Sequence, residues 1–341
     1  MEYPSTGRIA CITAPHTVEI QRRDIRPLSD HEVLIRIRAS ALCGSDLHIA
    51  RGKHPSVPLP ATIGHEFSGD VVAAGGKVSP FWLGKRVTAE PCTFCGQCDA
   101  CRRGQYNLCE ELRFIYRNGD GAMADYIVVR ESSLFSLPDA VSYDEGALME
   151  PLSVAIHAVR RANVSLGDTV FVLGDGAIGL LTAAACRLAG AQRILVAGHS
   201  QKRLALAREF GATETLDSHA RDSAEWVLQT AGGAAKAFEC VGSEACLEQV
   251  TRALRRGGTA AVVGIYEQPD IHMDISRLVT RELSIVGTQG YCHDFATAIS
   301  AAASIPLKKL VTHTFPLEQL DVALKTVMDR KNESIKAIIH P

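Results

Sequence analysis

Several residues that could bind and use a metal lie close together in the amino-terminal part of the chain. Cys43 starts the run Cys-Gly-Ser-Asp-Leu-His, which also supplies Ser45 and His48, and His65-Glu66 follows. Sulfur, imidazole nitrogen and carboxylate oxygen are ligands of catalytic zinc, which keeps one coordination position open. Taken singly, Cys43 also fits a small core residue and His65 a buried histidine with a hydrogen-bond partner. Together they favour a metal that activates an alcohol.

Four further cysteines are spaced for a second metal ion. Cys95, Cys98, Cys101 and Cys109 follow the pattern Cys-x2-Cys-x2-Cys-x7-Cys. Four thiolates complete a tetrahedral zinc site and leave no open position, so this zinc would be structural and would fix a loop. Disulfides or free thiols are the alternative, and an iron–sulfur pattern expects a shorter last gap and a following proline. Cys92 is the spare fifth cysteine of this region.

A glycine-rich turn indicates a dinucleotide site. Gly174-Asp-Gly-Ala-Ile-Gly179 follows a short apolar strand and opens an apolar helix, which is the context that gives this pattern meaning. Gly174 would permit the tight turn, Gly176 the approach of the pyrophosphate, and Gly179 the close packing of helix on strand. The alternative is a tight turn with no ligand. The other expected contacts from this half of the chain are made by Ile178, Val241 and Gly264.

The end of the next strand bears on the choice of cofactor. An acidic residue there would bind the ribose 2′-hydroxyl of NAD, but the chain has Gly198, followed by His199 and Ser200, with Arg203 one turn further. With no carboxylate to repel it, a 2′-phosphate could sit among these donors and charges. The sequence therefore favours NADP over NAD. The alternative is a solvated helix start that tolerates NAD.

The pattern of expected secondary structure changes near residue 169. Residues 8–130 read as β-rich, with short strands separated by turn residues, whereas strands alternate with helical segments from residue 169, as in a parallel doubly wound sheet. The expected strands are 33–37, 71–74, 86–89, 124–129, 170–173, 193–197, 213–216, 235–239, 259–263 and 283–286. The expected helices are 151–161, 177–188, 201–210, 221–230 and 244–254.

Composition excludes several classes of protein. The 341 residues are 46% hydrophobic and 22% charged, with a formal net charge of −2, and no basic stripe or long apolar run points to a nucleic-acid or membrane partner. The eleven cysteines are mostly clustered, and no secretory signal precedes them, so metal binding in the cytoplasm is expected rather than a disulfide framework.

The pattern Gly64-His65-Glu66-x2-Gly69-x5-Gly75-x2-Val78, with Cys43, the four-cysteine spacing and the glycine turn in the same order, resembles the zinc-containing alcohol dehydrogenases of the medium-chain dehydrogenase/reductase superfamily. The resemblance covers essentially the whole chain. It implies an α/β protein with a GroES-like, partly open β-barrel catalytic domain at 1–150, completed by 292–341. It also implies a Rossmann doubly wound parallel-sheet domain at 151–291 that binds NAD(P).

The resemblance also assigns roles. Cys43 and His65 would be ligands of the catalytic zinc, Glu66 an exchangeable ligand or a neighbour of the metal, and Glu150 the further ligand found in the sorbitol dehydrogenase-like branch. By itself, Glu150 could equally be a carboxylate at a helix start. Ser45 and His48 match the proton relay, which takes the proton of the alcohol to solvent while hydride passes to the nicotinamide.

The implied enzyme interconverts a secondary alcohol, of the polyol or sugar-acid class, and its ketone, with two zinc ions per subunit. Sorbitol dehydrogenases typically carry Arg-Tyr where this chain has Gly290-Tyr291, which puts sorbitol itself in doubt. By resemblance, edge strands of the cofactor domain pair subunits into a homodimer or homotetramer. Candidate pocket residues are Asp46, Phe114, Tyr116, Gln289 and Tyr291, and the alternative for each is a side chain that only packs against its neighbours.

Three alternatives remain open. An L-threonine dehydrogenase-like enzyme shares the scaffold, and turnover of an amino alcohol but not of polyols would identify it. A zinc-free quinone reductase would have no use for Cys43 or His65. A non-catalytic, zinc-stabilised NAD(P)-binding protein would hold metal only in the cysteine loop. Two zinc ions per subunit support the dehydrogenase, and one supports either of the last two.

Overall fold

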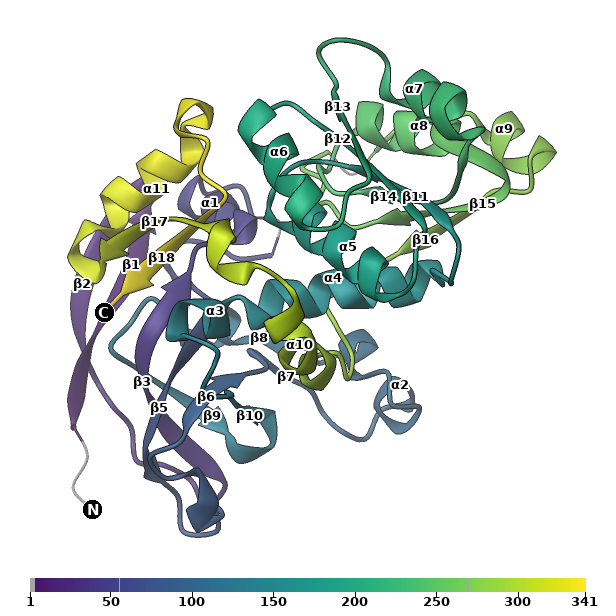
Figure 1. Cartoon of the computed structure of the whole chain (residues 1–341). Coiled ribbons are helices and arrows are strands. Elements are labelled where there is room, and N and C mark those ends of the chain that lie inside the picture. Colours follow the sequence, from purple (N-terminus) through teal and green to yellow (C-terminus); the bar gives the residue numbers. More distant parts are fainter. Residues whose placement is uncertain (1–3, 55, 269) are drawn as a thin grey trace. The chain divides into compact units, whose positions relative to one another are not determined.

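The computed structural model describes residues 4–54, 56–268 and 270–341. They form two compact units, each with its own sheets (Figure 1). The first unit is the chain up to Glu150 together with Ala298–Pro341, and the second is Pro151–Thr297. The two boundaries fall within helices α4 (Met149–Ala162) and α10 (Phe295–Ala301). Among the described residues, no helix has the length and apolar character needed to cross a membrane.

The first unit is built mainly from antiparallel strands. A three-stranded sheet has the order β2-β1-β4, and a seven-stranded sheet has the order β10-β6-β5-β3-β18-β17, with β9 paired to β3; β7 and β8 form a small ribbon. The strands are β1 (Thr6–Ala14), β2 (Thr17–Asp24), β3 (Glu32–Ala41), β4 (Ala61–Thr62), β5 (Glu66–Ala74), β6 (Arg86–Ala89), β7 (Cys92–Thr93), β8 (Arg113–Phe114), β9 (Tyr126–Arg130), β10 (Leu134–Ser136), β17 (Val311–Pro316) and β18 (Lys336–His340). The helices are α1 (Gly44–Ala50), α2 (Asp99–Arg102), α3 (Tyr143–Ala147) and α11 (Leu320–Met328).

Strand β3 organises the first unit. Its side chains alternate between buried and more exposed along the middle of the strand, as expected for a strand with one face on a core. Ala41, its last residue, pairs with Glu66 of β5 on one side and with Ile338 of β18 on the other. The end of β3 therefore brings together the start of β5, the start of β18 and the loop that holds Cys43, although these segments are far apart in the sequence.

The second unit is a six-stranded parallel sheet with the order β13-β12-β11-β14-β15-β16. This is the doubly wound arrangement, in which ligands bind beyond the carboxyl ends of the strands where the strand order reverses, here between β11 and β14. The strands are β11 (Thr169–Leu173), β12 (Arg193–Gly198), β13 (Glu214–Asp217), β14 (Ala234–Glu239), β15 (Leu254–Val262) and β16 (Ser284–Gly287). The helices are α5 (Ala177–Leu188), α6 (Gln201–Glu209), α7 (Ser223–Ala231), α8 (Glu244–Ala253) and α9 (Ile275–Thr280).

Candidate metal centres and dinucleotide site

Three of the predicted zinc ligands converge in the first unit. One ligand atom each from Cys43, His65 and Glu66 lies within 4.8 Å of the other two. Cys43 is the residue before helix α1, and Glu66 is the first residue of β5. His65 and Glu66 are buried, so the group is shielded from bulk water on most sides. A sulfur, an imidazole nitrogen and a carboxylate oxygen at this spacing match the donor set that zinc prefers.

Asp46 fixes the backbone at two of these ligands. Its carboxylate is fully buried and accepts the backbone N–H of Cys43 at 2.9 Å and that of Gly64 at 2.9 Å. Its Oδ1 also lies 3.8 Å from Nδ1 of His65, a buried nitrogen that no described hydrogen-bond partner reaches. The expectation that Asp46 lines the substrate pocket is therefore wrong, because its side chain is used to join the two loops that carry the ligands.

Lys336 is a buried partner of Glu66 that the sequence analysis did not find. Its Nζ donates to both carboxylate oxygens of Glu66 at 2.5 Å and to the backbone oxygen of Leu42 at 3.1 Å. Burial alone would lower the pKa of Lys336, but the carboxylate of Glu66 raises it above its ordinary value. The available signal was a lone lysine at the start of the apolar run 337–339. The pairing spans most of the chain, so spacing could not reveal it.

The buried acidic groups around Cys43 favour the binding of a cation. Burial raises the pKa of the Cys43 thiol to about 12, and the charge of Glu66 acts in the same direction. Burial raises the pKa of Glu150 to about 8; His65 opposes this shift, and the charges of Glu66 and Cys43 add to it. A divalent cation stabilises such groups as anions, so the donor set fits zinc. Glu150 is near enough to interact electrostatically, but it is not a member of the group within 4.8 Å.

Helix α1 carries both residues of the expected relay. Ser45 is buried and His48 is partly exposed, and their spacing of three residues puts them on one face of the helix. Two aromatic rings pack on the edge of His65: the ring centroid of Tyr116 is 5.3 Å away and that of Phe114 is 6.1 Å away. Phe114 and Tyr116, expected in the pocket, therefore lie beside a candidate metal ligand.

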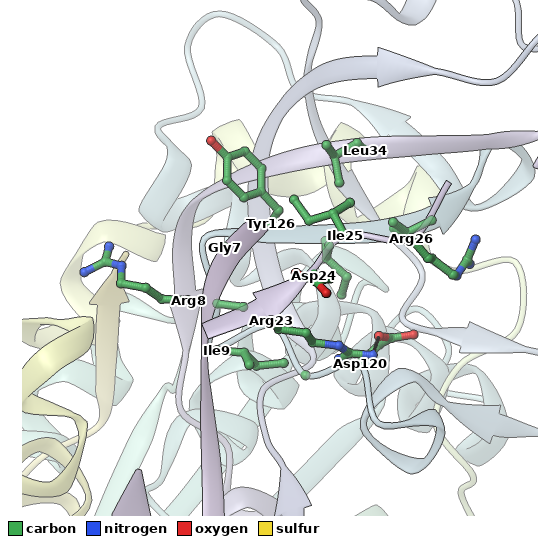
Figure 2. Close-up of a pocket in the computed structure, with 14 residues that line it drawn as sticks. Gly7, Arg8, Ile9, Arg23, Asp24, Ile25, Arg26, Leu34, Asp120 and Tyr126 are labelled. Carbon is green, nitrogen blue, oxygen red and sulfur yellow. Dashed lines mark ion pairs between the residues drawn. The ribbon is translucent and has the colours of Figure 1, made fainter. Parts of the chain in front are cut away.

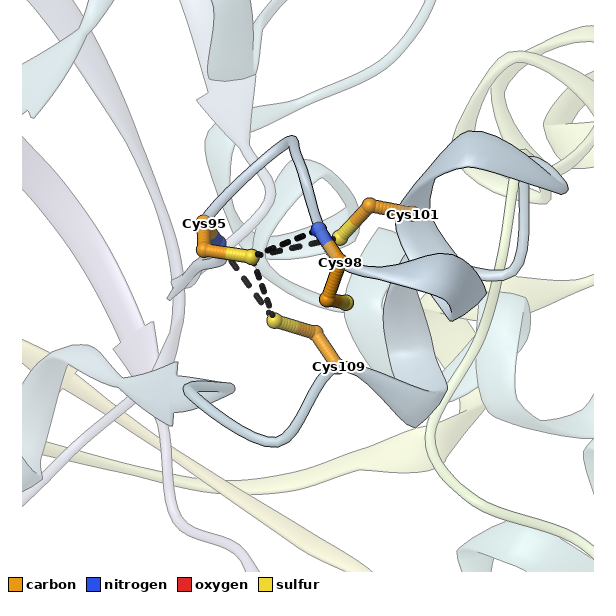
Figure 3. Close-up of side chains that lie close together, drawn as sticks. All are labelled: Cys95, Cys98, Cys101 and Cys109. Atoms are coloured by element: carbon orange, nitrogen blue, oxygen red, sulfur yellow. Dashed lines mark hydrogen bonds between the residues drawn. The ribbon is translucent and has the colours of Figure 1, made fainter.

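The four cysteines of the loop form a second compact group, in which one sulfur from each lies within 4.8 Å of the others (Figure 3). The sulfur–sulfur distance is 3.5 Å between Cys95 and Cys109 and 4.0 Å between Cys95 and Cys101. Zinc–sulfur bonds of about 2.3 Å in a tetrahedron put the sulfurs about 3.8 Å apart, so this geometry fits zinc. Backbone N–H groups of Gln97 and Cys98 lower the pKa of Cys95 to about 7, which favours the thiolate. Cys92, on β7, is not a member of the group.

The glycine turn lies between β11 and α5 in the second unit. Gly174 has a φ of +126°, which side chains rarely tolerate. A Cβ at Gly179 would lie 1.9 Å from the backbone oxygen of Gly174, whereas a Cβ at Gly176 would meet nothing within 4 Å. The turn is therefore tight where helix packs on strand and open where a pyrophosphate would approach. Ile178 is partly buried in the first turn of α5.

The loop after β14 is shaped by a buried carboxylate. Glu239 Oε1 accepts the N–H groups of Val241 and Gly242, both at 2.8 Å, and its backbone oxygen accepts the N–H of Gly264 at 3.0 Å. The Val241 side chain is left half exposed at the carboxyl edge of the sheet. Glu239 was not among the expected site residues, and its place as the last residue of a strand was the only signal.

The residues after β12 are held by the glycine turn itself. Asp175 Oδ2 accepts the N–H of His199 at 2.9 Å and that of Ser200 at 2.8 Å, and its Oδ1 lies 3.9 Å from Nη1 of Arg203. Ser200 caps α6, since its Oγ accepts the N–H of Arg203 at 3.3 Å. Asp175 thus brings a carboxylate to the end of β12, where the sequence analysis expected none.

The remaining pocket candidates, Gln289 and Tyr291, follow β16. Tyr291 is buried, and its ring packs edge-on against Phe295 at a centroid distance of 5.0 Å. This contact shows that the ring of Tyr291 belongs to the packing of the second unit.

Two of the surface pockets formed by described residues lie in the first unit. One contains Tyr116 in its wall, together with Ser56, Thr62 and Arg117, and so reaches the ring that packs on His65. The other lies between β1, β2 and β9 and is lined by none of the expected site residues (Figure 2). Its arginines are paired: Arg8 with Asp125, Arg23 with Asp120 and Arg26 with Glu32. The second pocket is therefore separate from the candidate site and has little net charge to offer a ligand.

Two family models match the chain. One, described as the alcohol dehydrogenase GroES-like domain, matches residues 29–139, and the other, described as zinc-binding dehydrogenase, matches residues 177–304. They confirm the predicted fold class, a GroES-like unit joined to a Rossmann unit. The first model lies within the first unit, and the second covers most of the second unit and continues to residue 304.

Known proteins resemble the chain along nearly its whole length. Sorbitol dehydrogenase of Bacillus subtilis is 34% identical, covering 99% of this chain and 98% of that protein. L-idonate 5-dehydrogenase of Vitis vinifera is 35% identical, covering 94% and 91% respectively. A crystal structure of a zinc-binding dehydrogenase from Sinorhizobium meliloti bound to NADP has a TM-score of 0.90 and 29% identity, covering 99% of this chain and all of that one.

Proposed function

The chain belongs to the zinc-containing alcohol dehydrogenase family, in its sorbitol dehydrogenase-like branch, and we propose that Cys43, His65 and Ser45 form the centre of its active site. As a member, it is a zinc-dependent, NAD(P)-linked oxidoreductase that interconverts an alcohol and its ketone. The observation that carries the proposal is the convergence of Cys43, His65 and Glu66 within 4.8 Å, next to the helix that bears Ser45 and His48.

The residues around the metal position have separate proposed roles. Cys43 and His65 would hold the catalytic zinc, with Glu150 as a further ligand, and the zinc would supply the Lewis acidity that lowers the pKa of the alcohol. Asp46 orients the two ligand loops through the N–H groups of Cys43 and Gly64. Glu66 is held by Lys336, so its charge is balanced while it stands beside the metal position.

The proton leaves by a separate route. Ser45 would accept it from the substrate hydroxyl and pass it towards His48, which is partly exposed and so can exchange protons with water. Histidine suits this step because its ordinary pKa lies near neutral pH. The Gly174–Gly179 turn would hold the pyrophosphate of a nicotinamide dinucleotide, which would supply the hydride acceptor.

The proposed substrate is a polyol or sugar acid. Two matched relatives are named for such substrates, sorbitol and L-idonate. In this chain, the pocket beside Tyr116 carries the hydroxyl group of Ser56 and the guanidinium of Arg117, which suit a substrate with several hydroxyl groups or a carboxylate. A second zinc in the four-cysteine loop would be structural, because four thiolates leave no open position.

We further propose that the protein works in the cytoplasm as a homodimer or homotetramer. All eleven cysteines are free thiols in the structure, and a reducing compartment keeps metal-binding thiols in that state. The proposed dimer would pair edge strands of the second unit, where β16 is an edge strand. Light scattering on the purified protein measures the subunit number directly.

A screen of alcohols with NAD and with NADP, read by absorbance of the reduced nicotinamide, tests the function. Polyols or sugar acids should be oxidised. Turnover of L-threonine without polyols would indicate the threonine dehydrogenase-like alternative. No turnover, with one zinc per chain, would indicate the non-catalytic protein.

Two variants test the roles of the relay residues. Ser45→Ala and His48→Ala should lower kcat by about 10²-fold or more while the zinc content stays at two per chain. His31→Ala, which removes an exposed histidine of the same unit, is the control and should change neither value. Loss of zinc from either relay variant would show that the residue supports the metal instead of the proton transfer.

A further inference from the structure

Asp175 lies where NAD-dependent and NADP-dependent dehydrogenases differ. It is the second residue of the glycine turn, and it is only 8% exposed. Its Oδ2 accepts the first two backbone N–H groups after β12, those of His199 and Ser200. In this fold, the end of the second strand faces the 2′-position of the adenosine ribose, which carries a hydroxyl in NAD and a phosphate in NADP.

Asp175 also explains the glycine at the end of β12. A Cβ on Gly198 would lie 2.4 Å from both Cβ and Cγ of Asp175, so no larger residue fits beside that side chain. The backbone of Gly198 is not in the left-handed region, and conformation alone does not require glycine there. Because Gly198 has no side chain, the side chain of Asp175 can fill the space beside it. The carboxylate missing from the strand end is supplied by the neighbouring turn.

We propose that Asp175 makes the enzyme select NAD over NADP. Two amide donors that could bind a 2′-phosphate are already used by its carboxylate, and that carboxylate would repel the phosphate charge. Arg203, the cation expected to attract the phosphate, has Nη1 3.9 Å from Asp175 Oδ1, so its charge is partly offset. The inference rests on the proposed function, and it replaces the NADP preference drawn from the sequence at Gly198.

Dissociation constants of NADH and NADPH, measured by calorimetry on the zinc-loaded full chain, test this selection without reference to turnover. The wild type should bind NADH at least about tenfold more tightly than NADPH. Asp175→Asn keeps the size of the side chain and one acceptor oxygen but removes the charge. It should therefore lower the ratio of the NADPH to the NADH dissociation constant at least about fivefold, chiefly because NADPH binds more tightly. A merely structural role would weaken both cofactors equally.

Two further variants sharpen the test. Asp168→Asn alters a carboxylate just before the amino end of β11, away from the carboxyl ends of the strands, where it accepts the N–H of Ser165 at 2.9 Å. This variant should leave the ratio of the two dissociation constants unchanged. Asp175→Gly combined with Gly198→Asp removes the Cβ that would clash, moves the carboxylate to the strand end and should restore the preference for NADH.

The outcomes separate this inference from the proposed function. Equal binding of the two cofactors by the wild type, tighter binding of NADPH, or a ratio unaffected by Asp175→Asn would each overturn the inference alone. Failure of both dinucleotides to bind would overturn the inference and the proposed function together.

Discussion

Replacing Lys336 by methionine should destabilise the first unit by about 3 kcal/mol at pH 7. The change removes the ammonium that donates to both oxygens of Glu66 at 2.5 Å and leaves a flexible apolar side chain of similar length. Glu66 is fully buried, so in the zinc-free protein the loss of its partner forces it to become neutral or to remain as an unpaired buried charge. Either state costs stability that the wild type does not lose.

The size of the effect follows from protonation of Glu66. In the unfolded chain its carboxyl has the ordinary pKa of 4.5, and burial raises that pKa in the folded state. Each pH unit over which the carboxyl is protonated in the folded chain but not in the unfolded chain costs about 1.4 kcal/mol. Breaking a buried ion pair typically costs about 3–5 kcal/mol, and the expected loss is taken from this range. Because the raised pKa belongs to a carboxyl, the penalty is largest at high pH and disappears as pH falls towards 4.5.

Urea unfolding followed by tryptophan fluorescence measures this loss. The chain has two tryptophans, Trp82 in the first unit and Trp226 in the second, so a Trp226→Phe background makes the signal report the unit that contains Lys336. Lys325→Met is the matched control, because Lys325 and Asp321 form an exposed pair at 3.2 Å. It should cost less than about 0.5 kcal/mol.

The double variant Lys336→Met/Glu66→Gln should recover most of the lost stability, since no buried charge is left unpaired. The stability penalty of the single variant should also become smaller as pH is lowered from 7 towards 4.5, because the pKa of the buried Glu66 carboxyl is raised in the folded state. A loss no larger than that of the control, or one independent of pH, would refute the reasoning that Lys336 balances the charge of Glu66.

Three further substitutions give direct readouts. Cys109→Ser should lower the zinc content, measured by elemental analysis, from two ions per chain to one, whereas Cys92→Ser should leave two. Equal zinc content in both variants would contradict a zinc site in the four-cysteine loop. Gly179→Ala should destabilise the second unit by several kcal/mol in urea unfolding, because its Cβ would lie 1.9 Å from the oxygen of Gly174. Gly176→Ala should fold normally, since its Cβ meets no protein atom within 4 Å, yet weaken NADH binding about tenfold or more in calorimetry; unchanged affinity would place the pyrophosphate elsewhere.

The sequence predicted most of the fold because the strongest signals are local. The apolar helix after the glycine turn was expected at 177–188 and is observed as α5, Ala177–Leu188. The alternation of strands and helices likewise indicated the parallel sheet. One boundary was less accurate: β15 begins at Leu254, directly after α8, and runs through Gly257 and Gly258, whereas the strand was expected to begin at residue 259.

Parts of the candidate site could not be read from spacing. Lys336 meets Glu66 only because β18 and β5 both pair with β3, and Asp175 reaches the end of β12 only because the turn lies beside it. The expected role of Asp46 was wrong for the same reason, since burial and long-range hydrogen bonds decide whether a carboxylate faces substrate or backbone. Short motifs specify which chemistry is present, whereas supporting side chains depend on the folded topology.

Anomalous X-ray scattering at the zinc edge, from crystals of the metal-loaded protein, tests the central claim most directly. The account predicts two peaks per chain, one surrounded by the four cysteine sulfurs and one about 2.3 Å from Sγ of Cys43 and about 2.0 Å from a ring nitrogen of His65. A single peak in the four-cysteine loop, with Cys43 and His65 making no contact with metal, would contradict it.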